Sequence, residues 1–105
     1  MRDYIMRLQI SSVPLEAQML ICEKVNPLIG ADIDTNDFGE ADGSLHFEYE
    51  DSIGGGQTPS QYFQEIAKAI RSVPGCGKGG KHDVQIVACF ADVPEPQFEE
   101  IKEDL

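Results

Sequence analysis

Positive charge is scarce in this chain. Its 105 residues include 8 Lys and Arg against 19 Asp and Glu, which gives a formal net charge of -11 at pH 7. Neither Lys nor Arg occurs between Lys24 and Lys68. Such a charge distribution repels nucleic-acid backbones and anionic membranes and favours basic partners. We therefore expect no direct binding to nucleic acid or to a membrane.

Long apolar runs and paired cysteines are also missing. A stretch of roughly 18 apolar residues, the length of a membrane span, does not occur. The three cysteines, Cys22, Cys76 and Cys89, are odd in number and far apart, which does not suit a disulfide framework. The alternating residues Met1 to Ile10 lack the basic start and apolar run of a signal peptide. These absences predict a cytoplasmic protein.

Alternating apolar residues predict four strands. Tyr4, Met6, Leu8 and Ile10 predict a strand over 2–11, and similar alternation predicts strands from Leu45 to Tyr49 and over 83–91. A weaker pattern predicts a strand over 31–38. The Asp42-Gly43 pair between this strand and the next is typical of a hairpin turn.

Two segments predict helices. In the first, Pro14 suits the first helical position, and apolar residues follow at helical spacing until Pro27: Leu15, Met19, Cys22 and Val25. In the second, Thr58, Pro59 and Gln61 predict a capping box, and the helix is expected to end at Pro74. Residues 93–105 form an acidic tail whose apolar spacing predicts a short amphipathic helix.

The order of these elements predicts an α+β fold in one domain spanning residues 1–105. It is the β-α-β-β-α-β order of the ferredoxin-like sandwich, in which two helices cover one face of a four-stranded antiparallel sheet. The short C-terminal helix is expected in addition.

No catalytic or cofactor motif is complete. Asp32-x-Asp34-x-Asn36 has the spacing that opens a calcium loop, but Asp37 and Gly43 occupy the positions where such a loop needs Gly and Glu. The glycine-rich, locally basic stretch 75–81 is open to two interpretations, an anion site or a mobile loop. Cys76 within it is a candidate exposed, reactive thiol, although neither histidine is expected beside it. We expect no enzyme activity, no metal and no cofactor.

The acidic segment is the candidate partner-binding site. Its residues are Asp32, Asp34, Asp37, Glu40, Asp42, Glu48, Glu50 and Asp51, with Phe38 as the exposed aromatic contact. The leading hypothesis is a small acidic inhibitor that binds a basic protein, such as a nuclease or a nucleic-acid-binding complex, and blocks its active or substrate-binding surface as a nucleic-acid mimic. Toxin-immunity proteins and phage anti-defence proteins of the anti-CRISPR type are two settings for such an inhibitor.

Two alternatives stay open. The first is a self-associating structural or regulatory domain, a homodimer formed through Ile5, Val87 and Cys89 on the uncovered face of the sheet. The second is a small-ligand-binding protein or a thiol-dependent enzyme that uses the loop from Cys76 to His82.

Overall fold

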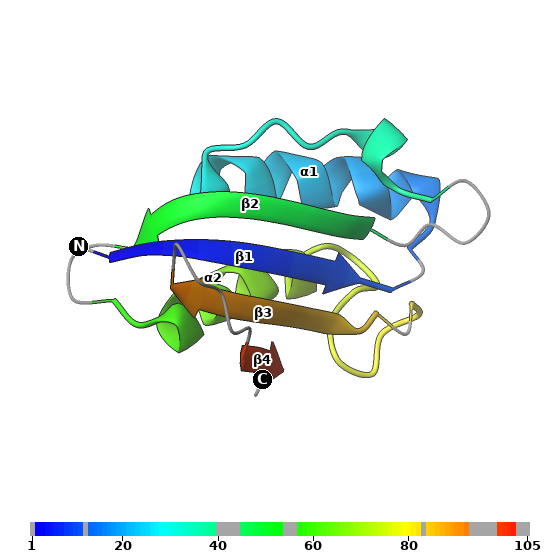
Figure 1. The fold of residues 1–105 in the computed structure, drawn as a ribbon. Helices are drawn as coiled ribbons and strands as arrows, with labels where there is room; N and C mark the ends of the chain where they lie inside the picture. The colour runs from blue at the N-terminus through cyan, green and yellow to red at the C-terminus, as the bar shows by residue number, and fades with distance from the viewer. Residues whose placement is uncertain are drawn as a thin grey trace.

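Two helices lie side by side on one face of an antiparallel sheet (Figure 1). The computed structural model describes residues 2–11, 13–39, 45–53, 57–82, 84–92 and 99–102. Along the chain the elements are β1 (Arg2–Ile10), α1 (Leu15–Ile29), the 3-10 turn η1 (Thr35–Asp37), β2 (Leu45–Ile53), α2 (Pro59–Arg71), β3 (Ile86–Asp92) and β4 (Glu99–Lys102).

Strand β1 is central in the sheet, whose order is β2-β1-β3-β4. It pairs antiparallel with β2 on one side and with β3 on the other. Strands β2 and β3 are therefore parallel to each other, and α2 connects them across β1. The short strand β4 pairs antiparallel with β3 and forms the second edge of the sheet.

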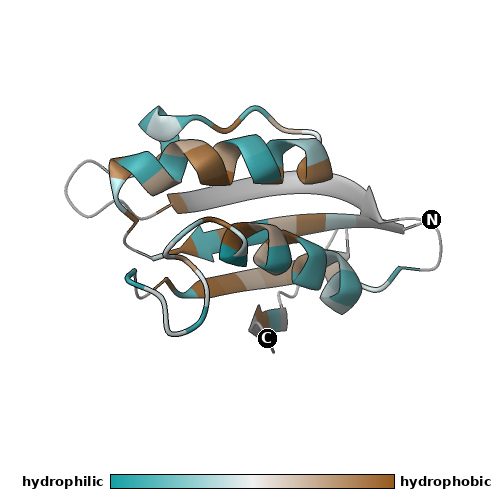
Figure 2. Cartoon of the chain, turned by 180° about the vertical axis from the view of Figure 1, so that it is seen from behind, coloured by the Kyte–Doolittle hydropathy of each residue, from teal (hydrophilic) through white to brown (hydrophobic). Residues whose placement is uncertain are grey.

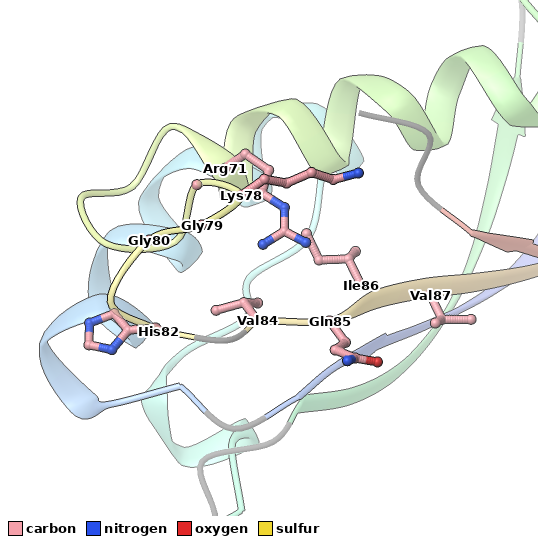
Figure 3. Close-up of a pocket in the computed structure, with 10 residues that line it drawn as sticks. Arg71, Lys78, Gly79, Gly80, His82, Val84, Gln85, Ile86 and Val87 are labelled. Carbon is pink, nitrogen blue, oxygen red and sulfur yellow. The ribbon is translucent and has the colours of Figure 1, made fainter.

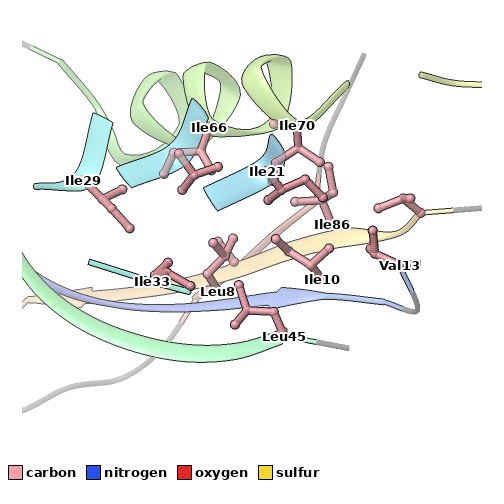
Figure 4. Close-up of a cluster of buried hydrophobic side chains, with 14 of the residues drawn as sticks. Leu8, Ile10, Val13, Ile21, Ile29, Ile33, Leu45, Ile66, Ile70 and Ile86 are labelled. Carbon is pink, nitrogen blue, oxygen red and sulfur yellow. The ribbon is translucent and has the colours of Figure 1, made fainter. Parts of the chain in front are cut away.

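The hydrophobic core lies between the helices and the sheet (Figure 4). The alternation predicted for β1 is confirmed, since Met6, Leu8 and Ile10 are all buried. Helix α2 carries a clean apolar face onto the sheet, where the rings of Tyr62 and Phe90 meet edge to face with their centroids 6.3 Å apart. Side chains from β1, β3 and both helices thus form one continuous cluster.

The capping box of α2 is confirmed. The amide of Gln61 donates to Thr58 Oγ1 at 3.2 Å, and the amide of Thr58 donates to Gln61 Oε1 at 2.9 Å. Helix α1 extends past Pro27 to Ile29, because a proline so near the end of a helix removes only one hydrogen bond. The helix ends instead at Gly30, which takes the left-handed conformation with φ 62°.

The predicted ferredoxin-like sandwich is wrong, because residues 31–38 do not form its second strand. The backbone of this segment is bound to α1 and to its own turn η1, and only Phe38 makes a single antiparallel bridge, to Leu45. The sheet therefore has three long antiparallel strands, and no complete hairpin is formed between residues 31–38 and β2 in the described part of the chain.

The predicted C-terminal helix is also wrong. Residues Glu99–Lys102 form β4 along the edge of β3, with Ile101 opposite Ala88. Ile101 packs against the core, while Glu100 is exposed, so the residues alternate as in a strand. Pairing with β3 also gives the backbone of that edge hydrogen-bond partners, which a helix would not provide.

Candidate partner-binding surface

Helix α1 is apolar on more than its core face. Its buried row includes Ala17, Ile21, Val25 and Ile29, which pack toward the sheet. Four other large apolar side chains are exposed, namely Leu15, Met19, Leu20 and Leu28. Brown segments therefore recur on the outward side of this helix (Figure 2).

Leu15 and Met19 are the most exposed of these side chains. They are 63% and 56% accessible, although the sequence pattern placed both on the buried face. The prediction was wrong because α1 is apolar on two faces, and helical spacing alone does not show which of the two faces meets the sheet. The two residues lie one turn apart and form a contiguous exposed pair.

The segment after α1 carries the nearest carboxylates. Residues 31–39 run back along α1, with η1 beside the N-terminal half of the helix (Figure 1). Asp34 caps η1, since its Oδ1 accepts from the amide of Asn36 at 2.8 Å. Asp37 completes a capping box, with its Oδ2 accepting from the amide of Asp34 at 2.9 Å. Both side chains are exposed and anionic while they hold the turn.

Asn26 fixes this segment to the helix. Its Nδ2 donates to the carbonyl oxygen of Ile33 at 2.8 Å, and its Oδ1 accepts from the amide of Ile33 at 2.9 Å. One side chain thereby satisfies both backbone groups of Ile33, whose own side chain is buried in the core. The position of η1 relative to α1 depends on this pair of hydrogen bonds.

The turn η1 contacts α1, next to the place where Asn26 pairs with Ile33. Burial raises the pKa of the Cys22 thiol, and the negative charges of Asp34 and Asp37 raise it further. Cys22 lies in the same helical row as Leu15 and Met19, at positions i, i+4 and i+7. The exposed apolar pair and the two carboxylates therefore border one another. We call Leu15, Met19, Glu23, Asp34 and Asp37 the α1–η1 surface.

The predicted site residues are only partly brought together. Asp32, Asp34 and Asp37 are exposed in the segment beside α1. Phe38, expected at the surface, is 4% accessible, because it bridges to Leu45 and joins the core. Glu40 and Asp42 lie outside the described residues. Glu48, Glu50 and Asp51 belong to β2, and their side chains lie outside the described part of the structure.

The uncovered face of the sheet is less apolar than expected. Ile5, Val87 and Cys89 are half-buried there. Exposed Arg7 lies directly opposite Cys89, and exposed Gln9 lies opposite Val87. Polar side chains thus alternate with the apolar ones across β1 and β3, and this face offers no continuous hydrophobic patch between those strands.

The predicted exposure of Cys76 is wrong. Its side chain is completely buried, and burial raises the pKa of the thiol despite the opposing charge of Arg71. Little thiolate is present at neutral pH under these conditions, so Cys76 is unsuited to nucleophilic chemistry. The residue contributes to packing beneath the glycine-rich loop.

Metal, membrane and family comparisons give no further assignment. Among the described residues, no three His, Cys, Asp or Glu side chains gather in a way that would hold a metal ion. Neither helix in that part of the chain combines the length and apolarity needed to cross a bilayer. Searches against family models, curated proteins and solved structures find no match to this chain.

Proposed function

We propose that this protein is a non-catalytic inhibitor that binds a basic protein through the α1–η1 surface. The observation that carries the proposal is that η1, with the exposed carboxylates of Asp34 and Asp37, contacts the helix that carries exposed Leu15 and Met19. Apolar side chains that lose contact with water supply most binding energy, whereas the charges around them steer and orient the partner.

The net charge of -11 sets the chemistry of the partner. A basic cleft, of the kind that binds DNA or RNA in nucleases and nucleic-acid-binding complexes, is complementary to this protein. Occupying such a cleft excludes its nucleic acid. An immunity protein against a toxin and a phage anti-defence protein of the anti-CRISPR type would both act in this way.

Capture at low salt, followed by an activity assay, tests the proposal. The protein is immobilised and exposed to host lysate, and each captured basic protein is assayed for nucleic-acid binding or cleavage with and without added inhibitor. We expect the double variant Glu23→Lys, Met19→Gln to bind the partner at least about tenfold more weakly, because it removes one apolar contact and reverses one charge.

Glu65→Lys is the matched control. Glu65 is exposed on α2, away from the α1–η1 surface, and its reversal changes the net charge by the same amount as Glu23→Lys. Asp34 and Asp37 are left intact because both cap η1. Equal binding by all three proteins, or a captured partner whose activity the protein does not reduce, would contradict the proposal.

A further inference from the structure

A second candidate site and the α1–η1 surface lie on opposite sides of strand β1. The second site is a pocket of about 560 Å³ between the end of α2, the glycine-rich loop and the start of β3 (Figure 3). The α1–η1 surface borders β2 instead, since η1 contacts that strand. Strand β1 separates β2 from β3, so the two sites are distinct. The volume is in the range that holds a small ligand.

The pocket has a cationic wall although the protein as a whole is acidic. Arg71 and Lys78 line it, and none of the described residues in its lining is Asp or Glu. Figure 3 shows the Arg71 guanidinium projecting between the loop and β3. Four of the eight Lys and Arg residues of the chain lie between positions 68 and 81, beside this pocket. Positive charge is therefore concentrated in the part of the chain that forms the pocket.

The loop that carries Lys78 is held in a defined shape. Arg71 Nη1 donates to the carbonyl oxygen of Cys76 at 2.8 Å, and the amide of His82 donates to the carbonyl oxygen of Gly75 at 2.9 Å. Gly80 packs so closely that a Cβ atom would lie 2.6 Å from the Gly75 oxygen. A wall with this many internal contacts is preorganised, which lowers the entropy lost on binding.

Backbone amides are also available in the loop that forms this wall. Within the described residues, the amides of Gly77, Lys78 and Gly79 make no hydrogen bond to another backbone group, and all three residues line the pocket. The C-terminal end of α2 opposes an anion, but the carbonyl groups of Lys68, Ala69 and Ile70 in its last turn already accept from Ser72 and Val73. Charged side chains and backbone amides together are the donors that phosphate oxygens accept.

The opposite wall combines polar and apolar side chains. Exposed Gln85 and half-buried Val87 line it, and the buried side chains of Val84 and Ile86 lie beneath them. A ligand that fills the pocket thus meets cations on one side and, on the other, one amide and one aliphatic side chain. This combination suits an organic molecule with an anionic group better than a bare inorganic ion.

We infer that the pocket binds a small organic phosphate monoester, with the phosphate against Arg71 and Lys78 and the organic group against Gln85 and Val87. A phosphate dianion matches two cations better than a single carboxylate does. The inference stands independently of the proposed inhibitor function, because it concerns the opposite side of β1.

Amide NMR titrations at constant ionic strength test the inference. The probes are phenyl phosphate, inorganic phosphate, benzoate and phenol. Phenyl phosphate is expected to shift the amides of residues 77–80 at millimolar concentration and to bind more tightly than the other three. Binding of benzoate as tight as that of phenyl phosphate, or an absence of saturable shifts in the loop, would overturn it.

Two exposed lysines provide a matched comparison. Lys78→Gln removes a pocket cation, and Lys24→Gln removes one positive charge from α1 without touching the pocket. We expect the first variant to weaken phenyl phosphate binding about tenfold, the effect of one charge-assisted hydrogen bond, and the second to leave it unchanged. Equal weakening by both variants would show non-specific attraction to positive charge and would refute the site.

Discussion

Replacing Asn26 with alanine tests how the segment after α1 is held. The substitution removes both side-chain hydrogen bonds to Ile33, at 2.8 and 2.9 Å, and leaves the partly buried amide and carbonyl of Ile33 without these partners. The helix itself can continue, because alanine is a good helix former. Any loss of stability therefore reports on the attachment of residues 31–38 rather than on α1.

The expected loss is about 2 kcal/mol of unfolding free energy. Each hydrogen bond contributes about 1 kcal/mol net, and each backbone group left unsatisfied adds a penalty of about 1 kcal/mol or more when water does not replace the partner. Because both groups are only partly buried, water can replace most of the lost partners, so the two penalties together add about 0.5 kcal/mol. The higher helix propensity of alanine over asparagine returns about 0.5 kcal/mol.

Urea unfolding measures the effect. For a slope of about 1–3 kcal/mol per molar urea, the midpoint is expected to fall by about 1 M with the slope unchanged. Asn36→Ala is the matched control, because Asn36 is exposed in η1 and its side chain forms no hydrogen bond with the described part of the chain. We expect the control to change stability by less than about 0.5 kcal/mol. Equal changes in the two variants would refute the role assigned to Asn26.

Three further predictions concern the second helix, the glycine-rich loop and the buried thiol. Thr58→Ala removes one half of the capping box and should lower the free energy of unfolding by about 1 kcal/mol in thermal denaturation, whereas Ser60→Ala in the same turn should have little effect. Gly80→Ala would place a Cβ atom 2.6 Å from the Gly75 oxygen and should cost about 2 kcal/mol or more, whereas Gly77→Ala, whose nearest contact is 3.5 Å away, should be far milder in the same assay. Because burial raises the pKa of the Cys76 thiol in the folded protein, unfolding is favoured as the pH rises above the usual pKa of a thiol. The free energy of unfolding should therefore fall with pH over that alkaline range, and Cys76→Ala should make this fall less steep. The free energy is measured in urea melts at several pH values, and an identical dependence on pH in the two proteins would contradict the assignment.

The elements that the sequence predicted correctly depend on local signals. Alternation identified β1, and the Thr58 to Gln61 capping box identified the start of α2. Residues 31–38 have a weaker strand pattern, and their backbone pairs instead with Asn26 and with the Asp34 turn. The conformation of residues 31–38 thus depends on Asn26 in the preceding helix. The composition of the segment alone does not predict that conformation.

Of the residues in the candidate surface, only Asp34 and Asp37 were predicted. Charge is visible in composition, and it correctly drew attention to Asp34 and Asp37 as exposed acids. The apolar half was missed because Leu15 and Met19 fit helical spacing as well as the buried residues do. The available signal was the unusual number of apolar residues around the whole of α1, which exceeds what one buried face requires.

The incomplete hairpin gives the acidic residues of β2 a second physical consequence. Strand β2 is an edge of the sheet, and in the described part of the chain its outer side is met only by the bridge from Phe38 to Leu45. Among the described residues, the rest of this nine-residue strand presents backbone donors and acceptors to any other strand. Glu48, Glu50 and Asp51 lie in this strand, and charges there oppose pairing between copies. The carboxylates of β2 would thus protect solubility even without a partner. Charge reversal in β2 would therefore alter self-association as well as partner binding. Substitution of Glu23 and Met19, which lie on a helix, is for this reason the better test of the inhibitor proposal.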